Sequence, residues 1–395
     1  MSYSFESSAC RKDTNAEKYK LREKLFGTDD IEPVWVADMD IDTPDFVVDA
    51  IKKRLEHPVF GYEEVPDSAY EAQIDWLYRH HGVKFEVEDF FYSHSVVASM
   101  HAAIQAFSEV GDNIIVQTPV YPPFFKSVTK LDRKVLLNPL KKLNNGSYTF
   151  DLDDLKSKID DKTKMILLCS PHNPVGHVWR KDELEELLDI CIQHNIVVFA
   201  DEIHSDLVYK PNKHIPFASL SDKARDITVS TYGVGKTFNM AGFSISTVVI
   251  TNKKLREKFQ EVHKKIHFAE GTTLSHVAFE AAYKHGDLWL SELQEHLYKN
   301  YTMLKELCDK YPSLIKLTPI EATYLAWLDC KNISKSDKEI REFFINEAKL
   351  GLNSGISFGR AGSGFMRLNF GVSSAKMSKI ISQLETAFRN RGKNG

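Results

Sequence analysis

Between about residues 90 and 250, short apolar runs alternate with segments whose apolar residues recur every three or four positions. The runs are rich in β-branched residues and lack the strict alternation of half-exposed strands, so they predict strands buried on both faces. They cover residues 113–119, 135–140, 165–170, 197–201, 227–230 and 247–251. The segment 181–195 predicts an amphipathic helix, because its leucines share one helical face. This alternation predicts an α/β fold with right-handed crossovers and a mostly parallel sheet.

From about residue 288 the pattern changes. A long polar helix is expected first, then a strand, a charged helix, a glycine-rich stretch and a last strand; the ranges are 288–311, 323–329, 338–348, 351–364 and 365–370. This order predicts a smaller α+β domain. The N-terminal segment has little core of its own and is expected to join that domain. The predicted division is therefore an N-terminal segment 1–43, a large domain 44–287 and a small domain 288–395.

Three polar residues lie at or shortly after the ends of predicted strands: Asn173, Asp201 and Lys236. In a parallel sheet, ligands bind beyond the carboxyl ends of the strands, where these three side chains would meet. Pyridoxal phosphate needs such a set, because an amine holds its aldehyde, a carboxylate keeps its ring nitrogen protonated and a donor faces its phenolic oxygen. The sequence therefore favours pyridoxal phosphate as the cofactor.

Each of these residues also has an ordinary structural interpretation. Asp201 alone would read as a strand-end cap, and Asn173 precedes a proline in a typical turn. Lys236 is distinguished by Gly233 and Gly235, since glycines allow unusual torsions and a close approach to a ligand. A nucleotide P-loop is excluded, because it requires a glycine five residues before Gly235, where Ser230 stands.

Further candidates are less specific. Arg367 lies in an apolar strand, so it needs either a substrate carboxylate or an internal salt bridge. Tyr121 is flanked by prolines and either stacks on a flat ring or fills core. Ser95 and the next two residues precede a predicted helix, 98–109, whose first N–H groups would suit a phosphate. His204 is either a satisfied buried residue or a contact to the phenolic oxygen.

Composition narrows the class of protein. The net charge is −4, so the 395-residue chain has no basic field to attract nucleic acid or an acidic membrane. Five scattered cysteines without a CxxC pair argue against a disulfide framework or a cysteine zinc site. His263 and His267 are four residues apart but lack a third ligand, which favours a solvated face over a metal site. The polar start and the lack of a long apolar run make the cytoplasm the expected location.

Taken together, these segments resemble the fold-type I pyridoxal-phosphate enzymes of the class I/II aminotransferase superfamily. The motif GVGKTFN at 233–239 is similar to the superfamily's lysine signature. Other motifs resemble the C–S β-lyase branch, the MalY/PatB-type cystathionine β-lyases; they are VWVADMD at 34–40, FGY at 60–62, NPVG at 173–176, ADEIHSDLVY at 200–209 and TYLAWLD at 323–329. The resemblance implies a three-layer, aspartate aminotransferase-like large domain with a mostly parallel sheet and a smaller α+β domain.

The resemblance also implies residue roles around the ring. Lys236 carries the covalent bond to the cofactor, and Asp201 pairs with the ring nitrogen. Asn173 and His204 fall where the family contacts the phenolic oxygen, and Tyr121 stacks on the ring.

Further roles concern the phosphate and the substrate. By resemblance, Val96 and Val97 lie in the phosphate loop, although 94–97 reads HSVV where the family usually has Pro-Gly-Val-Val. Tyr62 would reach the phosphate of a neighbouring subunit, which implies a homodimer with shared sites. Arg367 would bind the substrate carboxylate.

A second departure concerns hydroxyl groups. The family often places hydroxyls just before the lysine, where Gly233 and Gly235 stand here. Ser230, Thr231 or Tyr232 would then have to supply the missing donors to the phosphate.

The expected activity is α,β-elimination from cystathionine, cysteine or cysteine S-conjugates, giving a thiol, pyruvate and ammonia. An aminotransferase remains an alternative, because in both reactions the same lysine removes the Cα proton. A cofactor-binding regulatory protein with weak turnover is a third interpretation. Only the branch resemblance favours the lyase.

Overall fold

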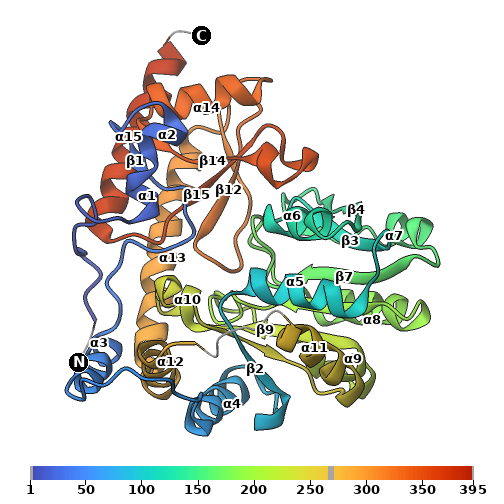
Figure 1. Ribbon diagram of the computed structural model, residues 1–395. Coiled ribbons are helices and arrows are strands. Elements are labelled where there is room, and N and C mark those ends of the chain that lie inside the picture. Colours follow the sequence, from blue (N-terminus) through green and yellow to red (C-terminus); the bar gives the residue numbers. More distant parts are fainter. Residues whose placement is uncertain (1–2, 266–270, 394–395) are drawn as a thin grey trace.

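A seven-stranded sheet forms the centre of the larger part of the molecule (Figure 1). The computed structural model describes residues 3–265 and 271–393. In spatial order the strands are β2 (Phe90–Ser93), β10 (Ser246–Val249), β9 (Thr228–Tyr232), β8 (Val197–Asp201), β7 (Thr163–Cys169), β3 (Asn113–Thr118) and β4 (Lys134–Pro139). Every strand of this sheet except β10 runs in one direction. The predicted mostly parallel sheet is therefore confirmed.

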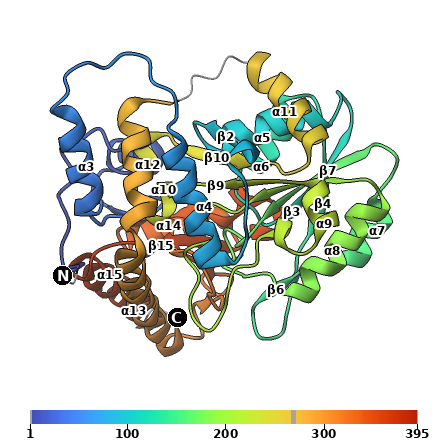
Figure 2. The same cartoon turned by 90° about the horizontal axis from the view of Figure 1, so that it is seen from below.

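Helices cover both faces of this sheet. In β3, Ile114 packs into one apolar cluster and its neighbour Ile115 into another, because successive side chains point to opposite faces. The cluster of Ile114 includes α5 (Val96–Phe107), α6 (Pro123–Lys130) and α11 (Lys253–Lys265). The cluster of Ile115 includes α7 (Leu152–Lys158), α8 (Lys181–Gln193) and α9 (Asp222–Ile227). These are the three layers seen in Figure 2, and they explain why the strands are apolar without alternation.

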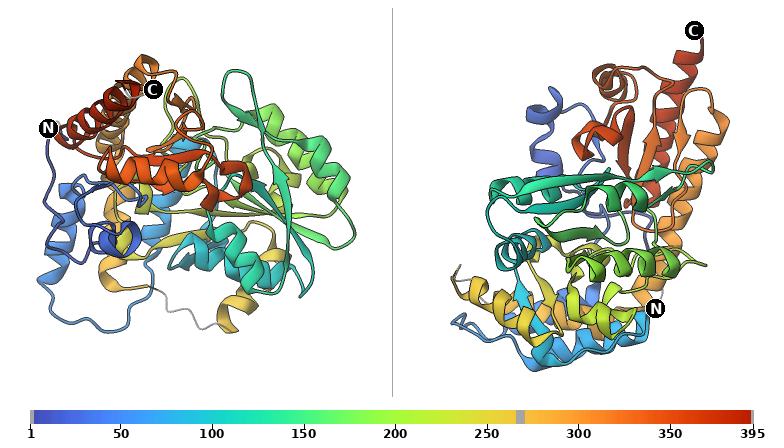
Figure 3. Two further views of the ribbon diagram at one scale, coloured as in Figure 1. Left: turned by 90° about the horizontal axis from the view of Figure 1, so that it is seen from above. Right: turned by 90° about the vertical axis from the view of Figure 1, so that its right-hand side faces the viewer.

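The smaller part is built on a four-stranded antiparallel sheet. Its strands are, in spatial order, β11 (Lys316–Leu317), β12 (Leu325–Asp329), β15 (Phe365–Asn369) and β14 (Asn353–Ser354). The accompanying helices are α13 (Asp287–Lys310), α14 (Asp337–Asn346) and α15 (Ser374–Lys393). Figure 3 shows these elements stacked against one end of the large sheet. Most of their apolar side chains join one cluster that also includes helices of the large part, whereas Trp327 and Phe365 pack into the cluster of Ile115.

The N-terminal residues lie beside the small sheet. They form α1 (Glu17–Lys20), α2 (Arg22–Phe26) and β1 (Glu32–Pro33), and β1 pairs in parallel with β13 (Leu350–Gly351). Next come α3 (Asp45–Leu55) and α4 (Asp67–His81), which pack against α12 (Thr273–His285). The exact domain limits, 43/44 and 287/288, stay predictions. None of the helices described is long and apolar enough to cross a bilayer.

Candidate active site

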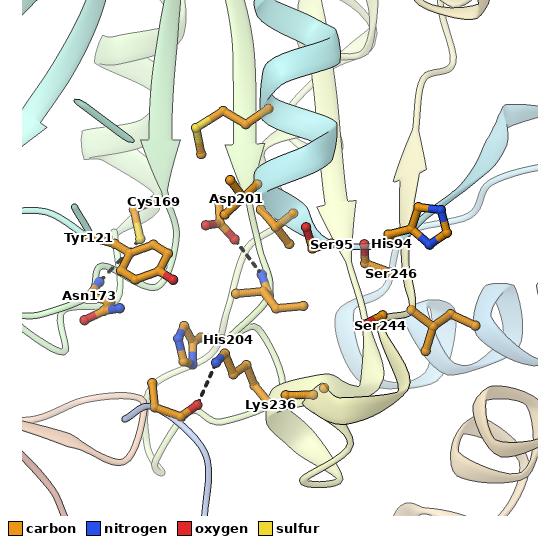
Figure 4. Close-up of a pocket in the computed structure, with 18 residues that line it drawn as sticks. His94, Ser95, Tyr121, Cys169, Asn173, Asp201, His204, Lys236, Ser244 and Ser246 are labelled. Atoms are coloured by element: carbon orange, nitrogen blue, oxygen red, sulfur yellow. Dashed lines mark hydrogen bonds between the residues drawn. The ribbon is translucent and has the colours of Figure 1, made fainter. Parts of the chain in front are cut away.

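One cavity opens at the carboxyl edge of the large sheet (Figure 4). Asn173 reaches it from the turn after β7, and Asp201 is the last residue of β8. Lys236 reaches it from the short helix α10 (Val234–Thr237), which follows β9. The parallel strand directions bring these three side chains to one edge although Asn173 and Lys236 are 63 positions apart in the sequence.

Lys236 points its amine into the cavity. Its Nζ donates a hydrogen bond to the carbonyl oxygen of Ala37, 2.6 Å away, along the dashed line from Lys236 in Figure 4. Burial and the nearby charge of Arg367 lower the pKa of Lys236 to about 8, although Asp38 and Asp201 oppose the shift. An amine with this pKa is deprotonated in a useful fraction near neutral pH, as a nucleophile or a base must be.

Asp201 is a buried carboxylate whose Oδ1 accepts a hydrogen bond from the backbone N–H of Ile203 at 3.2 Å. Burial raises the pKa of Asp201 to about 7, although this hydrogen bond and the charge of Lys236 oppose the rise. Within residues 3–265 and 271–393 no basic side chain forms an ion pair with Asp201. A cationic ring nitrogen at this position would supply the missing opposite charge.

Polar and aromatic side chains line the wall of the cavity between Lys236 and Asp201. His204 is buried, its Nδ1 has no hydrogen-bond partner, and its ring meets Tyr324 edge-on. Tyr121 lines the cavity and is 36% exposed. Cys169 also lines it, but burial and Asp201 raise the pKa of its thiol well above the usual value, which fits the predicted core role rather than a nucleophile.

The opposite wall is rich in donors. Helix α5 begins at Val96, and Ser95 caps it by accepting a hydrogen bond from Ala98 N at 3.1 Å. The first N–H groups of a helix have no acceptor within it, so those of Val96 and Val97 suit an anion. Both residues line the cavity.

Sequence reasoning missed two residues of this wall, Ser244 and Ser246, and gave His94 no role beyond its place in the phosphate-loop motif. Because β10 is antiparallel to β9, its start, rather than its end, lies at the edge where β9 ends. The sequence did contain a signal for this wall, namely the hydroxyl groups of Ser244 and Ser246 just before and at the start of β10, the strand that follows Lys236.

The predicted donors Ser230, Thr231 and Tyr232 are buried in β9 and are not among the residues that line the cavity. Thr231 instead donates to the carbonyl oxygen of Ala200. Their role as phosphate donors stays a prediction, which the lining of the cavity does not favour. Ser244 and Ser246 take the place expected for them.

The glycines before Lys236 are explained by packing rather than by unusual torsions. A Cβ at Gly233 would lie 3.1 Å from Ile203 Cδ1 and 3.2 Å from Ser246 Cα. Gly233 has an extended backbone with φ 172°, which any residue adopts. Gly235 itself lines the cavity next to Ala241. From the sequence, these glycines are expected to allow unusual torsions and a close approach to a ligand. The geometry fits only the close approach.

Arg367 lies in β15 and is not among the residues that line the cavity, but it bonds Asn173, which does line it. Its guanidinium donates to Asn173 Oδ1 at 3.1 Å, to Trp35 O at 2.9 Å and to Asn353 Oδ1 at 2.7 Å. Among the described residues no carboxylate forms an ion pair with it, so the internal salt bridge considered from the sequence is not formed. Burial lowers the pKa of Arg367 to about 10. A buried guanidinium held only by neutral oxygens is suited to an added carboxylate.

Tyr62 lies elsewhere. It is fully exposed and is not among the residues that line the cavity. The segment between α3 and α4 that contains it forms an outlying arch in Figure 2. Its role remains a prediction that requires a second subunit.

The residues present fit pyridoxal phosphate. The cavity offers an amine at Lys236, an unpaired carboxylate at Asp201, an orphaned buried nitrogen on His204 and a helix start with hydroxyls for a phosphate. The described residues contain no cluster of three or more side chains suited to a metal ion. His263 bonds the carbonyl of Tyr92, and His267 lies outside the described residues.

Comparison with known proteins agrees with this site. The model of the family described as aminotransferase class I and II matches residues 36–384. The chain belongs to the aminotransferase class I and II family. It is 37% identical to cystathionine beta-lyase PatB of Bacillus subtilis, over 97% of this chain and 99% of that protein. Protein MalY of Escherichia coli is 32% identical, over 92% of this chain and 93% of MalY.

Solved structures of this family have the same fold. The PLP-bound C–S lyase from Staphylococcus hominis is 31% identical and superimposes with a TM-score of 0.89, covering 98% of both chains. The fold class and the resemblance to the C–S lyase branch of the aminotransferase class I and II family, both predicted from the sequence, are confirmed.

Proposed function

We propose that this protein is a pyridoxal-phosphate-dependent C–S β-lyase that acts on cystathionine, cysteine or cysteine S-conjugates. Its products would be a thiol, pyruvate and ammonia. The observation that carries the proposal is the end-to-end similarity to PatB, together with Lys236, Asp201 and Asn173 around one cavity. The similarity to a structure described as a PLP-bound C–S lyase supports the same cofactor and reaction.

When bound, pyridoxal phosphate supplies an aldehyde for amines and a ring that withdraws electrons from the substrate Cα. Lys236 would hold that aldehyde through its amine. Asp201 would keep the ring nitrogen protonated, and Asn173 and His204 would face the phenolic oxygen. Tyr121 would cover one face of the ring.

On the phosphate side, the N–H groups of Val96 and Val97 would bind oxygens together with the hydroxyls of Ser95, Ser244 and Ser246. Ser230 stays a predicted phosphate contact, although it is buried in β9 and is not among the residues that line the cavity.

The substrate would be held and deprotonated by two side chains. Arg367 binds its α-carboxylate through paired N–H donors, which fixes the direction of the Cα–H bond. The Lys236 amine takes the Cα proton as the general base. Loss of the thiolate from Cβ then distinguishes a lyase from an aminotransferase, which returns the proton to the cofactor side.

A homodimer with shared sites is part of the proposal. Val59, Phe60 and Tyr62 are exposed on one segment, which favours a partner that covers them. A cytoplasmic location is proposed as well, since the cysteines described are free thiols, as expected in a reducing compartment.

The decisive test is incubation with L-cystathionine and no keto acid. We expect pyruvate to accumulate over many turnovers. A single turnover that stops with the cofactor aminated would support the aminotransferase instead, and no product from any amino acid would support a binding protein.

The covalent role of Lys236 has its own test. Borohydride should trap a cofactor adduct on the peptide that contains Lys236, and Lys236→Ala should lose the adduct and at least about 100-fold in the rate of pyruvate release. Lys284→Ala, at an exposed i,i+4 pair with Glu280, serves as the control. An adduct on a different lysine would contradict the assignment.

A further inference from the structure

Residues 35–41 form a segment with bends at residues 36–38, called the strap below, that lies between α10 of the large part and β15 of the small part. It contains residues 36–40, VADMD, which are part of a motif that resembles the C–S β-lyase branch. The proposed function assigns these residues no part in the reaction. Its backbone is bonded from both sides, by residues that follow Lys236 and by residues that follow Arg367.

Both functional side chains bond carbonyl groups of the strap. Lys236 Nζ donates to Ala37 O at 2.6 Å, and an Arg367 N–H donates to Trp35 O at 2.9 Å. These two carbonyl groups lie only two residues apart on the strap. The strap therefore fixes how far apart the amine and the guanidinium lie.

The first link is Asn239, three residues after Lys236. Its Oδ1 accepts from Met39 N at 2.9 Å, and its Nδ2 donates to Met39 O at 3.0 Å and to Ile41 O at 2.6 Å. Its backbone φ of 55° lies in the left-handed region, which asparagine tolerates better than most residues. This conformation turns the side chain back onto the strap.

The second link is Asn369, two residues after Arg367. Its Nδ2 donates to Val36 O and to Asp38 O, both at 2.6 Å, and its Oδ1 accepts from Gly371 N at 2.7 Å. Asn369 is fully buried, so it has no water to replace these bonds. Each functional side chain is thus followed within a few residues by an asparagine that holds the same strap.

Buried and half-buried ion pairs anchor the strap to the N-terminal residues. Lys18 is fully buried, with its Nζ 2.8 Å from Asp38 Oδ1 and 3.4 Å from Asp40 Oδ2. Arg11 bonds the same two carboxylates, at 2.7 Å and 3.0 Å. Such a network resists displacement, because moving one charge leaves its partners buried and unpaired.

We propose that Asn239 and Asn369 are positioning residues that hold the Lys236 amine and the Arg367 guanidinium at a fixed spacing across the strap. The inference rests on the proposed function, in which Arg367 binds the carboxylate of a substrate whose Cα proton Lys236 removes. A displacement of about 1 Å is enough to slow such a step by up to about 100-fold. Loss of Asn239 should mainly slow proton transfer, and loss of Asn369 should mainly weaken carboxylate binding.

The test uses the cofactor-loaded full chain with Asn239→Ala and Asn369→Ala. Asn300→Ala is the matched control, since Asn300 is equally buried and donates to Phe370 O and Val372 O without touching the strap. Two quantities are measured. One is the rate at which L-alanine, which has no leaving group at Cβ, exchanges its Cα proton in D₂O. The other is the propionate concentration that half-saturates the absorbance change of the bound cofactor.

For Asn239→Ala we expect the exchange rate at saturating alanine to fall about tenfold, with propionate half-saturation within about twofold of the unsubstituted protein. For Asn369→Ala we expect half-saturation to rise about tenfold, with a smaller change in the exchange rate. Asn300→Ala should lower the melting temperature and change neither quantity by more than about twofold.

Equal changes of both quantities in all three variants would overturn the inference, because they would reflect lost stability alone. If Asn369→Ala does not fold, Asn369→Ser replaces it. Its hydroxyl can donate to one strap carbonyl, so an intermediate half-saturation is expected, and an unchanged value would overturn the inference. Alanine exchange without pyruvate release from cystathionine would reject the lyase but leave the positioning result intact, whereas no exchange in the unsubstituted protein would reject both.

Discussion

Asp201 and Lys236 lie in one cavity that disfavours charge. Burial pushes the pKa of the acid up to about 7 and that of the base down to about 8, so each group is shifted toward its neutral form. A cationic ring beside Asp201 would reverse the first shift, because an opposite charge stabilises the carboxylate. The chemistry of these two residues therefore depends on the cofactor as much as on the protein.

The shift of Asp201 predicts how stability depends on pH in the cofactor-free protein. Its folded pKa lies above the usual 3.8, so the folded state binds more protons than the unfolded state between about pH 4 and 7, and this residue destabilises the fold as pH rises through that window. Asp201→Asn removes the effect. The free energy of unfolding of each protein is measured by urea denaturation at pH 5 and at pH 7. We expect the difference, Asp201→Asn minus unsubstituted, to be about 2 kcal/mol larger at pH 7 than at pH 5.

Asp206→Asn is the matched control for this prediction. Asp206 is equally buried, but hydrogen bonds from His81, Trp76 and Thr237 outweigh the effect of burial and lower its pKa. Its substitution should therefore cost stability at neutral pH. Parallel pH profiles for Asp201→Asn and the unsubstituted protein would contradict the assigned environment of Asp201.

At the scale of elements, the central strands could be predicted almost to the residue. The run 113–119 becomes β3 (Asn113–Thr118), and 197–201 becomes β8. Continuous apolar runs are reliable here because both faces of the sheet are covered by helices. The four-residue β2 (Phe90–Ser93) was missed, since so short a run carries too little pattern.

The pattern of strands predicted the side of the site with Asn173, Asp201 and Lys236, but not the side with Ser244 and Ser246. Asn173, Asp201 and Lys236 follow parallel strands, so the rule for strand ends applies to them. Ser244 and Ser246 precede or begin the antiparallel strand β10, whose direction is set by tertiary pairing with β9 rather than by local sequence. Strand direction is the information that the sequence pattern lacks.

The start of α5 yields a prediction at this scale. Ser95→Ala removes the cap on Ala98 N, which should cost about 1 kcal/mol of stability. It also removes a hydroxyl beside the proposed phosphate site, so affinity for pyridoxal phosphate, measured by titrating the cofactor-free protein, should fall as well. Ser336→Ala removes the equivalent cap of α14, far from the cavity, and should cost similar stability without changing cofactor affinity. Equal cofactor affinity in both variants would argue against a phosphate at α5.

At the scale of the whole molecule, the site depends on contacts that are distant in sequence. One apolar cluster joins α4, α12 and α13 to the small sheet, and the strap bonds Lys236 on one side and Arg367 on the other. The residues of these contacts are separated by up to 332 positions, between Trp35 and Arg367. Sequence periodicity reports on one element at a time, so it identified the motif of the strap but not its position.

The exposed segment with Tyr62 gives the last prediction, which concerns assembly. If Tyr62 completes the partner's site, Tyr62→Ala and Lys236→Ala chains should each be nearly inactive alone. Mixed and allowed to exchange subunits, half of the dimers become hybrids in which one of the two sites has both residues intact, so about a quarter of the unsubstituted activity should return. Asn173→Ala mixed with Lys236→Ala is the control, because both residues line the same cavity of one chain and no hybrid site is complete. No recovery in the first mixture would mean that Tyr62 does not complete the partner's site, whereas recovery in the control would mean that Asn173 and Lys236 do not act in the same site.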